Sequence, residues 1–178
     1  MLAVESLLFS RYLMYRAVYW HRTMRIATAM IKRAVLLGMQ DGQIQPRELY
    51  GLTDSGFLRL LDTRRHPAFV LVDAVHARRL HRQAFRVRFD PRRNDHQGLE
   101  QPVSRLVVES RLRAAAAEEL GKTVYDHEVI IDVPERNSFV TDLLVQPEDG
   151  SVPVPFAQTH TVFGPDVVAR FGQTLRSI

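Results

Sequence analysis

The sequence predicts a predominantly helical α+β protein, a helical layer followed by a small antiparallel sheet with packed helices. Apolar residues recur at helical spacing through the first half of the chain. Short apolar stretches rich in β-branched residues, separated by turn residues, gather in the second half. We therefore expect a helical part over residues 1–85 and a small α+β lobe over residues 86–178.

The composition is that of a soluble folded protein, with 46% apolar and 25% charged residues in 178. No apolar run approaches the roughly 20 residues that span a bilayer, so we expect no membrane partner. Zero cysteines exclude disulfides and thiolate metal sites, and they fit a cytoplasmic location. The 24 basic residues are nearly all arginine and raise the isoelectric point to about 9.8, so phosphates are the natural partners.

The stretch from Phe9 to Val35 organises the chain. It reads either as one long helix bent near Tyr19 or as two helices that meet there. One helical stripe of apolar residues is expected to face the core: Trp20, Met24, Ala27, Ile31, Ala34 and Val35. The cations off this stripe are expected to point away from the core: His21, Arg22, Arg25, Lys32 and Arg33.

Aromatic rings stand beside guanidinium groups in the same stretch. Tyr12, Tyr15, Tyr19 and Trp20 alternate with Arg11, Arg16, His21 and Arg22. Flat rings next to guanidinium groups suit a ligand that carries a base and phosphates. The alternative is that the aromatics belong to the core and the arginines are their solvated flank.

The rest of the first half predicts two more helices. Asp41-Gly42 marks a turn, and residues 43–49 form a loop. A helix capped by Thr53 or Asp54 runs through Arg64. Pro67 opens a further helix that continues to about Ala84 and ends in Arg78, Arg79 and Arg82.

The second half predicts strands around one long helix. Residues 85–89 alternate apolar and basic side chains as a strand does, and residues 90–97 form a polar turn. A helix from Pro102 to Leu120 ends at Gly121. Strands follow over 128–133, 139–145 and 159–163, with a hairpin-like tip at 148–150, and a helix closes the chain. The long helix is expected to share one buried face: Val103, Leu106, Val107, Ser110, Ala114 and Ala117.

The pattern R-Y-L-M-Y-R-x-V-Y-x-H-x-T-x-R over residues 11–25 resembles HD-domain phosphohydrolases of the deoxynucleotide triphosphohydrolase type. In that family a His, an adjacent His-Asp pair and a distant Asp hold a divalent metal. This chain has no His-Asp dipeptide, and Asp95-His96 and Asp126-His127 run in the reverse order. It therefore resembles the carboxy-terminal part of such an enzyme, with residues 1–85 as a helical part of its core.

The resemblance implies metal-assisted attack of water on a deoxynucleotide triphosphate by the whole enzyme. The metal would be held in an upstream HD lobe, and this chain alone is expected to be inactive. By position, Arg11, Tyr19 and Trp20 resemble substrate-binding residues, although tryptophan departs from the polar residue usual there. An effector nucleotide would contact a second set: His21, Arg22, Arg78 and Arg82.

Two other functions remain open from the sequence. A basic helical module with interleaved aromatics could bind single-stranded nucleic acid. A subunit that only assembles is the second alternative. Large apolar faces on the first helices and on the Pro67–Ala84 helix predict a homo-oligomer. The histidines are scattered and predict no metal site.

Overall fold

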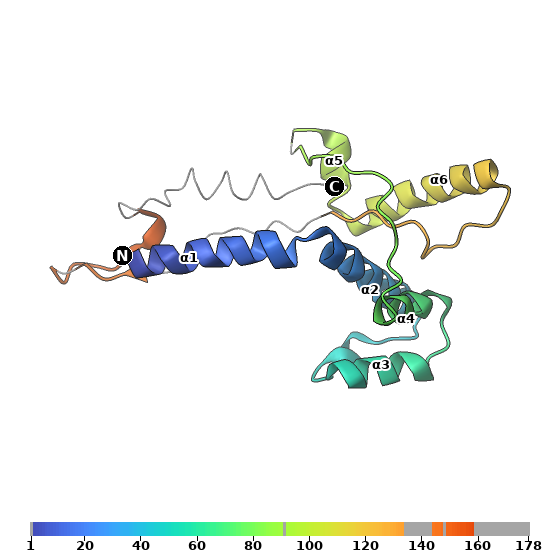
Figure 1. The fold of residues 1–178 in the computed structure, drawn as a ribbon, viewed down its shortest axis with the longest axis horizontal. Helices are drawn as coiled ribbons and strands as arrows, with labels where there is room; N and C mark the ends of the chain where they lie inside the picture. The colour runs from blue at the N-terminus through green and yellow to red at the C-terminus, as the bar shows by residue number, and fades with distance from the viewer. Residues whose placement is uncertain (1, 91, 134–143, 148, 159–178) are drawn as a thin grey trace. The chain divides into compact units, whose positions relative to one another are not determined.

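The computed structural model describes residues 2–90, 92–133, 144–147 and 149–158, and these are mostly helical with a two-stranded antiparallel sheet (Figure 1). The predicted fold class is confirmed. The α-helices are α1 (Leu2–Met14), α2 (Arg22–Gln40), α3 (Asp54–Thr63), α4 (Val70–His76), α5 (Asn94–Gly98) and α6 (Pro102–Leu120). A π-helix, η1 (Tyr15–Tyr19), extends α1. Short 3-10 turns are η2 (Pro46–Leu49), η3 (Pro67–Phe69) and η4 (Phe156–Gln158), and the strands are β1 (Leu144–Val145) and β2 (Val154–Pro155).

The chain forms two compact units. One comprises residues 1–21, 87–89 and 134–178, and the other comprises residues 22–86 and 90–133. Each unit is therefore built from segments far apart in the sequence. The division predicted from the sequence, at residue 85, is a different one and stays a prediction.

The opening stretch contains two helices, the second of the two arrangements allowed by the sequence. Helix α1 with η1 ends at Trp20, whose N–H donates to Tyr15 O over 2.8 Å, and α2 begins at Arg22. Within the second unit, α2 packs against η3 and α4, and α3 adds Leu61 to the same core. The buried core side chains are Met30, Ala34, Ile44, Leu61, Phe69, Leu71 and Val72.

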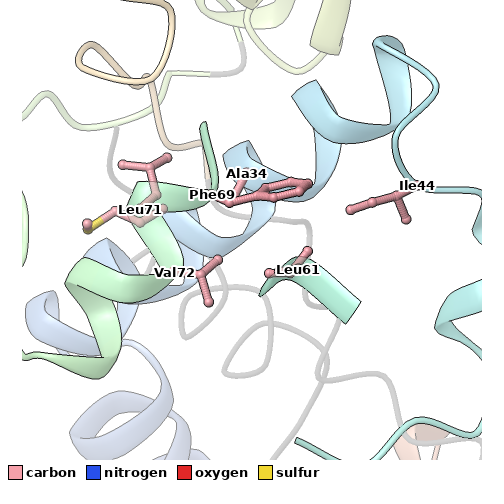
Figure 2. Packing of buried hydrophobic residues seen from close by; sticks show 7 residues of the cluster. Ala34, Ile44, Leu61, Phe69, Leu71 and Val72 are labelled. Atoms are coloured by element: carbon pink, nitrogen blue, oxygen red, sulfur yellow. The ribbon is translucent and has the colours of Figure 1, made fainter. Parts of the chain in front are cut away.

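Close packing at Gly38 shapes the centre of this core. A Cβ atom there would lie 2.8 Å from Phe69 Cε1 and 3.0 Å from Ile44 Cδ1. Figure 2 shows the Phe69 ring between Ala34 and Ile44, with Leu61 and Val72 nearby. Glycine therefore lets the Phe69 ring lie directly on the α2 backbone.

Two helices begin where the sequence predicts. Thr53 caps α3 by accepting a hydrogen bond from the Gly56 N–H over 3.1 Å. Pro102 occupies the first turn of α6, and Gly121 ends α6 in the left-handed region at φ 62°. Strand β1 falls within the strand predicted at 139–145. It pairs with β2, which the sequence did not predict, with Leu144 opposite Pro155 and Val145 opposite Val154.

The buried face of α6 is not the predicted one. Val103 is 74% exposed and Val107 is 50% exposed, and Ser110 and Ala114 are also exposed. The buried residue of α6 in the described part of the chain is Glu109, at 0% exposure. Glu109 forms an ion pair with Arg33 of α2, so the side of α6 that carries Glu109 is buried and the valine side chains are exposed.

The predicted orientation of one cation is also wrong. Arg33 is 5% exposed and lies inside the second unit, because its Nη2 forms an ion pair with Glu109 Oε2. Arg22 and Lys32 are exposed as expected, whereas Arg25 is half-buried and pairs with Asp132. The buried stripe of α2 is accordingly shifted to Ala29, Met30, Arg33, Ala34 and Gly38.

The helix predicted from Pro67 to Ala84 is too long, because α4 ends at His76. The predicted strand over residues 85–89 reduces to an isolated bridge at Arg88, and residues 128–133 do not form the strand predicted there. Side chains replace strand pairing in this last segment: Ile131 N–H donates to Glu109 Oε1 over 2.7 Å, and Asp132 accepts from Arg25. The predicted strand at 159–163, most of that at 139–145 and the last helix lie outside the described residues.

Candidate functional site

Arg11, Tyr15 and Tyr19 form a row of contacting side chains along α1 and η1, which we call the ladder. The Arg11 guanidinium lies 5.6 Å from the centre of the Tyr15 ring, and the Tyr15 and Tyr19 ring centres are 5.1 Å apart. The three residues are spaced by four, which places them on one helix face. The resemblance at residues 11–25 places Arg11 and Tyr19 in a substrate site and leaves Tyr15 out. The four-residue spacing was the signal that could have included it.

The second half of this ladder is π-helical. The i to i+5 hydrogen bond from Trp20 to Tyr15 closes η1. Single π-turns inside α-helices are rare and are frequent at functional sites. Tyr19 is 53% exposed, Arg11 and His21 are exposed, and Trp20 is half-buried. The rings and the cation therefore offer an accessible surface for a flat, anionic ligand.

The predicted effector arginines belong to the second unit. Arg22 opens α2, and Arg78 and Arg82 follow α4; all three are exposed. Their convergence on one phosphate stays a prediction.

Arg78 ends α4 in a conformation that normally requires glycine. Its φ is 57°, and it is the one non-glycine residue with positive φ in the described part of the chain. Its N–H donates to Val75 O over 3.0 Å, and the Arg79 N–H donates to Ala74 O over 2.7 Å. These two bonds form a Schellman motif with arginine at the left-handed position. An L-residue there costs about 1–2 kcal/mol.

A buried ionic cluster in the second unit was not found from the sequence. Glu109 contacts Arg33 and accepts from the Ile131 N–H, so it links α6, α2 and the segment at 129–133. The contact between Arg33 Nη2 and Glu109 Oε2 is an ion pair without the alignment of a hydrogen bond. The apolar residues of α6 lie on its other face and do not mark Glu109 as buried. Its partner Arg33 lies more than seventy residues away, so no local sequence pattern predicts the pair.

The dipeptides Asp95-His96 and Asp126-His127 both make contacts with other residues of the second unit. Arg93 donates to Asp95 and holds the pKa of that carboxyl down at about 2, and His96 accepts from the Asp90 N–H over 2.9 Å. Asp126 pairs with Arg113 at 2.7 Å. The His127 ring stacks on Tyr125 at 5.7 Å, and its carbonyl lies 3.0 Å from His81 Nε2. Burial, above all, lowers the pKa of His127.

These residues do not fit the family's divalent metal. Within the described ranges, no three His, Cys, Asp or Glu side chains gather to hold a metal ion. The same part of the chain contains no helix long and apolar enough to cross a membrane.

An open groove of about 640 Å³ lies at the end of α6. Its polar lining includes Ser110, Arg113, Lys122, Thr123 and Asp126. The carbonyl end of a helix carries partial negative charge, and Arg113 is already paired with Asp126. Arg113 and Lys122 therefore offset the negative charge of Asp126 and of the helix end. The groove is accordingly a weaker anion-binding site than the exposed arginines.

The family model for the HD-associated region matches residues 1–151 of the 178. The chain belongs to the HD-associated-region family. An uncharacterized protein of Methanocaldococcus jannaschii is 44% identical over 59 residues, which are 33% of this chain and 13% of that protein. The match thus spans a small part of that relative's length. No solved structure matches the chain.

All the candidate residues of this HD-associated region lie within the matched stretch, from Arg11 to Arg82. Glu109 and Arg33 of the buried cluster do so too. The family relation shows that the chain is related to HD-domain proteins, as the resemblance at residues 11–25 implied.

Proposed function

We propose that this chain is the nucleotide-binding accessory part of an HD-domain phosphohydrolase of the deoxynucleotide triphosphohydrolase type. Its role would be to bind nucleotide phosphates and bases and to contribute contacts in a homo-oligomer. The HD domain, an upstream lobe, would hold the divalent metal and the attacking water. The family relation supports the HD-domain partner, and the exposed arginines and rings support the nucleotide.

The Arg11–Tyr15–Tyr19 ladder supports a substrate role for the first unit. A base can stack on the exposed Tyr19 ring while the Arg11 guanidinium, whose charge lies over Tyr15, faces the phosphates. Trp20 and His21 extend the same surface into the break before α2.

The left-handed Arg78 is the observation that carries the effector role. Backbone strain of this kind persists where function requires it, because glycine would remove the strain and keep the Schellman motif. Arginine instead presents a guanidinium beside Arg79 and near Arg82, all exposed. Three cations at one helix end repel one another until an anion screens them. We therefore assign a nucleotide phosphate to this end, with Arg22 of the same unit as a further ligand.

The test is a titration of the purified chain with GTP and dGTP, monitored by calorimetry. A charge-assisted bond to phosphate contributes about 1.5–3 kcal/mol, so Arg78→Ala should weaken binding about tenfold or more. Arg78→Gly should weaken binding equally while raising the free energy of unfolding by about 1 kcal/mol. Arg59→Ala, at an exposed position of α3, is the matched control and should bind as the parent chain does.

Two results would contradict the proposal. Equal nucleotide affinity in the parent chain and in both Arg78 variants would show that Arg78 does not belong to an effector site. Binding of single-stranded DNA that falls steeply with salt, without nucleotide binding, would favour the nucleic-acid module instead.

A further inference from the structure

Helix α6 presents an exposed row of apolar and small side chains, which we call the α6 face. Val103 is 74% exposed, Val107 is 50% exposed, and Ser110 and Ala114 are exposed as well. The residues of this face are spaced alternately by four and three: Val103, Val107, Ser110, Ala114, Ala117 and Gly121. Two helices that pack along their length in a coiled coil use the same spacing. The α6 face therefore has the geometry to receive a second helix.

A groove runs along the carboxy-terminal half of the α6 face. The segment 122–126 lines the groove together with α6, and Arg113 Nη1 ties it to the helix through an ion pair with Asp126 Oδ1 over 2.7 Å. Four members of the α6 face line the groove: Ser110, Ala114, Ala117 and Gly121. No atom lies within 4 Å of the position that a Cβ would take at Gly121. Because these side chains are small, a helix in the groove can approach the α6 backbone closely.

Two opposite charges flank the α6 face on one side. Arg111 and Glu118 are seven residues apart, which places them on the same side of the helix and separates them by about 10 Å along its axis. They are therefore too far apart to pair with each other. Both side chains are exposed, and neither belongs to an ion pair of the described residues. In coiled coils, charges at such flanking positions select the partner helix and its direction.

A second copy of α6 in the antiparallel direction satisfies both charges at once. Every contact occurs twice in a two-fold pair, so Arg111 of each copy can face Glu118 of the other. The same register sets small residues against small ones, with Ala114 opposite Ala117 and Ser110 opposite Gly121. A parallel pair in register would instead place like charges opposite each other at both positions, which is unfavourable. The charges therefore complement a second copy of this chain in one direction.

We infer that α6 of a second copy of this chain lies in the groove, antiparallel to the first, with two equivalent ion pairs between Arg111 and Glu118. This interface rests on the homo-oligomer contacts of the proposed function and assigns them to a surface. It uses neither the ladder nor the arginines that follow α4. The interface and the nucleotide site can therefore be tested separately.

The experiment reverses the charges one at a time and measures the dissociation constant of the dimer by sedimentation equilibrium of the full chain. Arg111→Glu and Glu118→Arg each place like charges opposite each other twice, so each should raise the dissociation constant about tenfold or more. The double variant Arg111→Glu/Glu118→Arg restores both attractions and should return the constant to near the parent value. Arg59→Glu, at an exposed position of α3, is the matched control and should associate as the parent chain does.

An equimolar mixture of the two single variants tests the direction of the pair. In a mixed dimer the acidic position 111 of one copy faces the basic position 118 of the other, and the unchanged Arg111 faces the unchanged Glu118. The mixture should therefore associate as the parent chain does, although each variant alone does not. A general loss of stability would not be recovered in this way.

The inference is overturned if the parent chain stays a monomer at high concentration, which would leave the groove to a different protein. It is also overturned if the single reversals associate as the parent chain does, if Arg59→Glu weakens association equally, or if neither the mixture nor the double variant recovers association. Nucleotide binding is measured separately by calorimetry, so a failure of the nucleotide role is distinguished from a failure of this interface.

Discussion

Helices α2 and α6 are both 19 residues long, but α2 buries apolar side chains and α6 buries a charged one. Helix α2 buries Met30, Ala34 and Gly38 and packs against η3 and α4. Helix α6 buries Glu109 and exposes Val103 and Val107. An apolar stripe therefore predicts that a helix forms, but it does not predict which side of that helix is buried. The Arg33–Glu109 pair, which joins the two, decides how α6 is turned.

Removing one partner of that pair should have the largest effect. Glu109→Ala leaves the buried Arg33 charge without a counter-ion and should lower the free energy of unfolding by about 3–5 kcal/mol. Denaturant titration measures the loss. The double variant Arg33→Met/Glu109→Leu replaces both charges with apolar side chains and should recover most of it. A loss below about 1 kcal/mol in Glu109→Ala would mean that the pair does not hold α6.

Filling the contact at Gly38 should have the next largest effect, in the α2 core. An added Cβ would lie within 3.0 Å of both Phe69 and Ile44. Overpacking of this kind should cost about 1–3 kcal/mol in Gly38→Ala, measured by denaturant titration. Gly98→Ala is the control, because nothing lies within 4 Å of the atom that it would add. Equal stability of the two variants would show that Phe69 does not rest on α2.

A substitution on the outward face of α6 should change assembly rather than folding. Val107→Asp places a charge at a position that is 50% exposed, so stability should change by no more than about 0.5 kcal/mol. We expect the parent chain to form dimers or higher forms by light scattering, and Val107→Asp to shift the mass toward the monomer. A monodisperse parent monomer at high concentration would show that this apolar face has no second copy as its partner.

The regular parts of this fold could be predicted from the sequence because their signals are local. Thr53 and Gly121 mark helix ends through their own backbone chemistry, and the long helix follows from its periodicity. The orientation of α6 could not be predicted, because it depends on Arg33, which is distant in sequence. The early end of α4 was missed for another reason: Arg78 adopts a conformation that glycine normally signals. The resemblance at residues 11–25 assigns Arg11 and Tyr19 to a substrate site, and this assignment stays a prediction. The π-turn that brings Tyr19 beside Tyr15 has no sequence signal.

A titration of pH should give the smallest effect. Burial, assisted by the charges of His81 and His66 and opposed by Glu128 and Asp126, lowers the pKa of His127 below 6.5. The unfolded chain then binds more protons than the folded chain just below that pH, so stability should rise as pH rises toward 6.5. His127→Gln should flatten this part of the profile, and the exposed His76→Gln should not. An unchanged slope in His127→Gln would assign it to another group.

We expect this chain to bind nucleotide without hydrolysing it. The direct measurement incubates the purified chain with dGTP and manganese or magnesium, and then quantifies bound nucleotide and released triphosphate in the same sample. We expect saturable binding that requires Arg78, with the nucleotide recovered intact. Triphosphate release that a chelator abolishes would contradict it, because a metal centre would then exist in this chain. Absence of any bound nucleotide would contradict it equally.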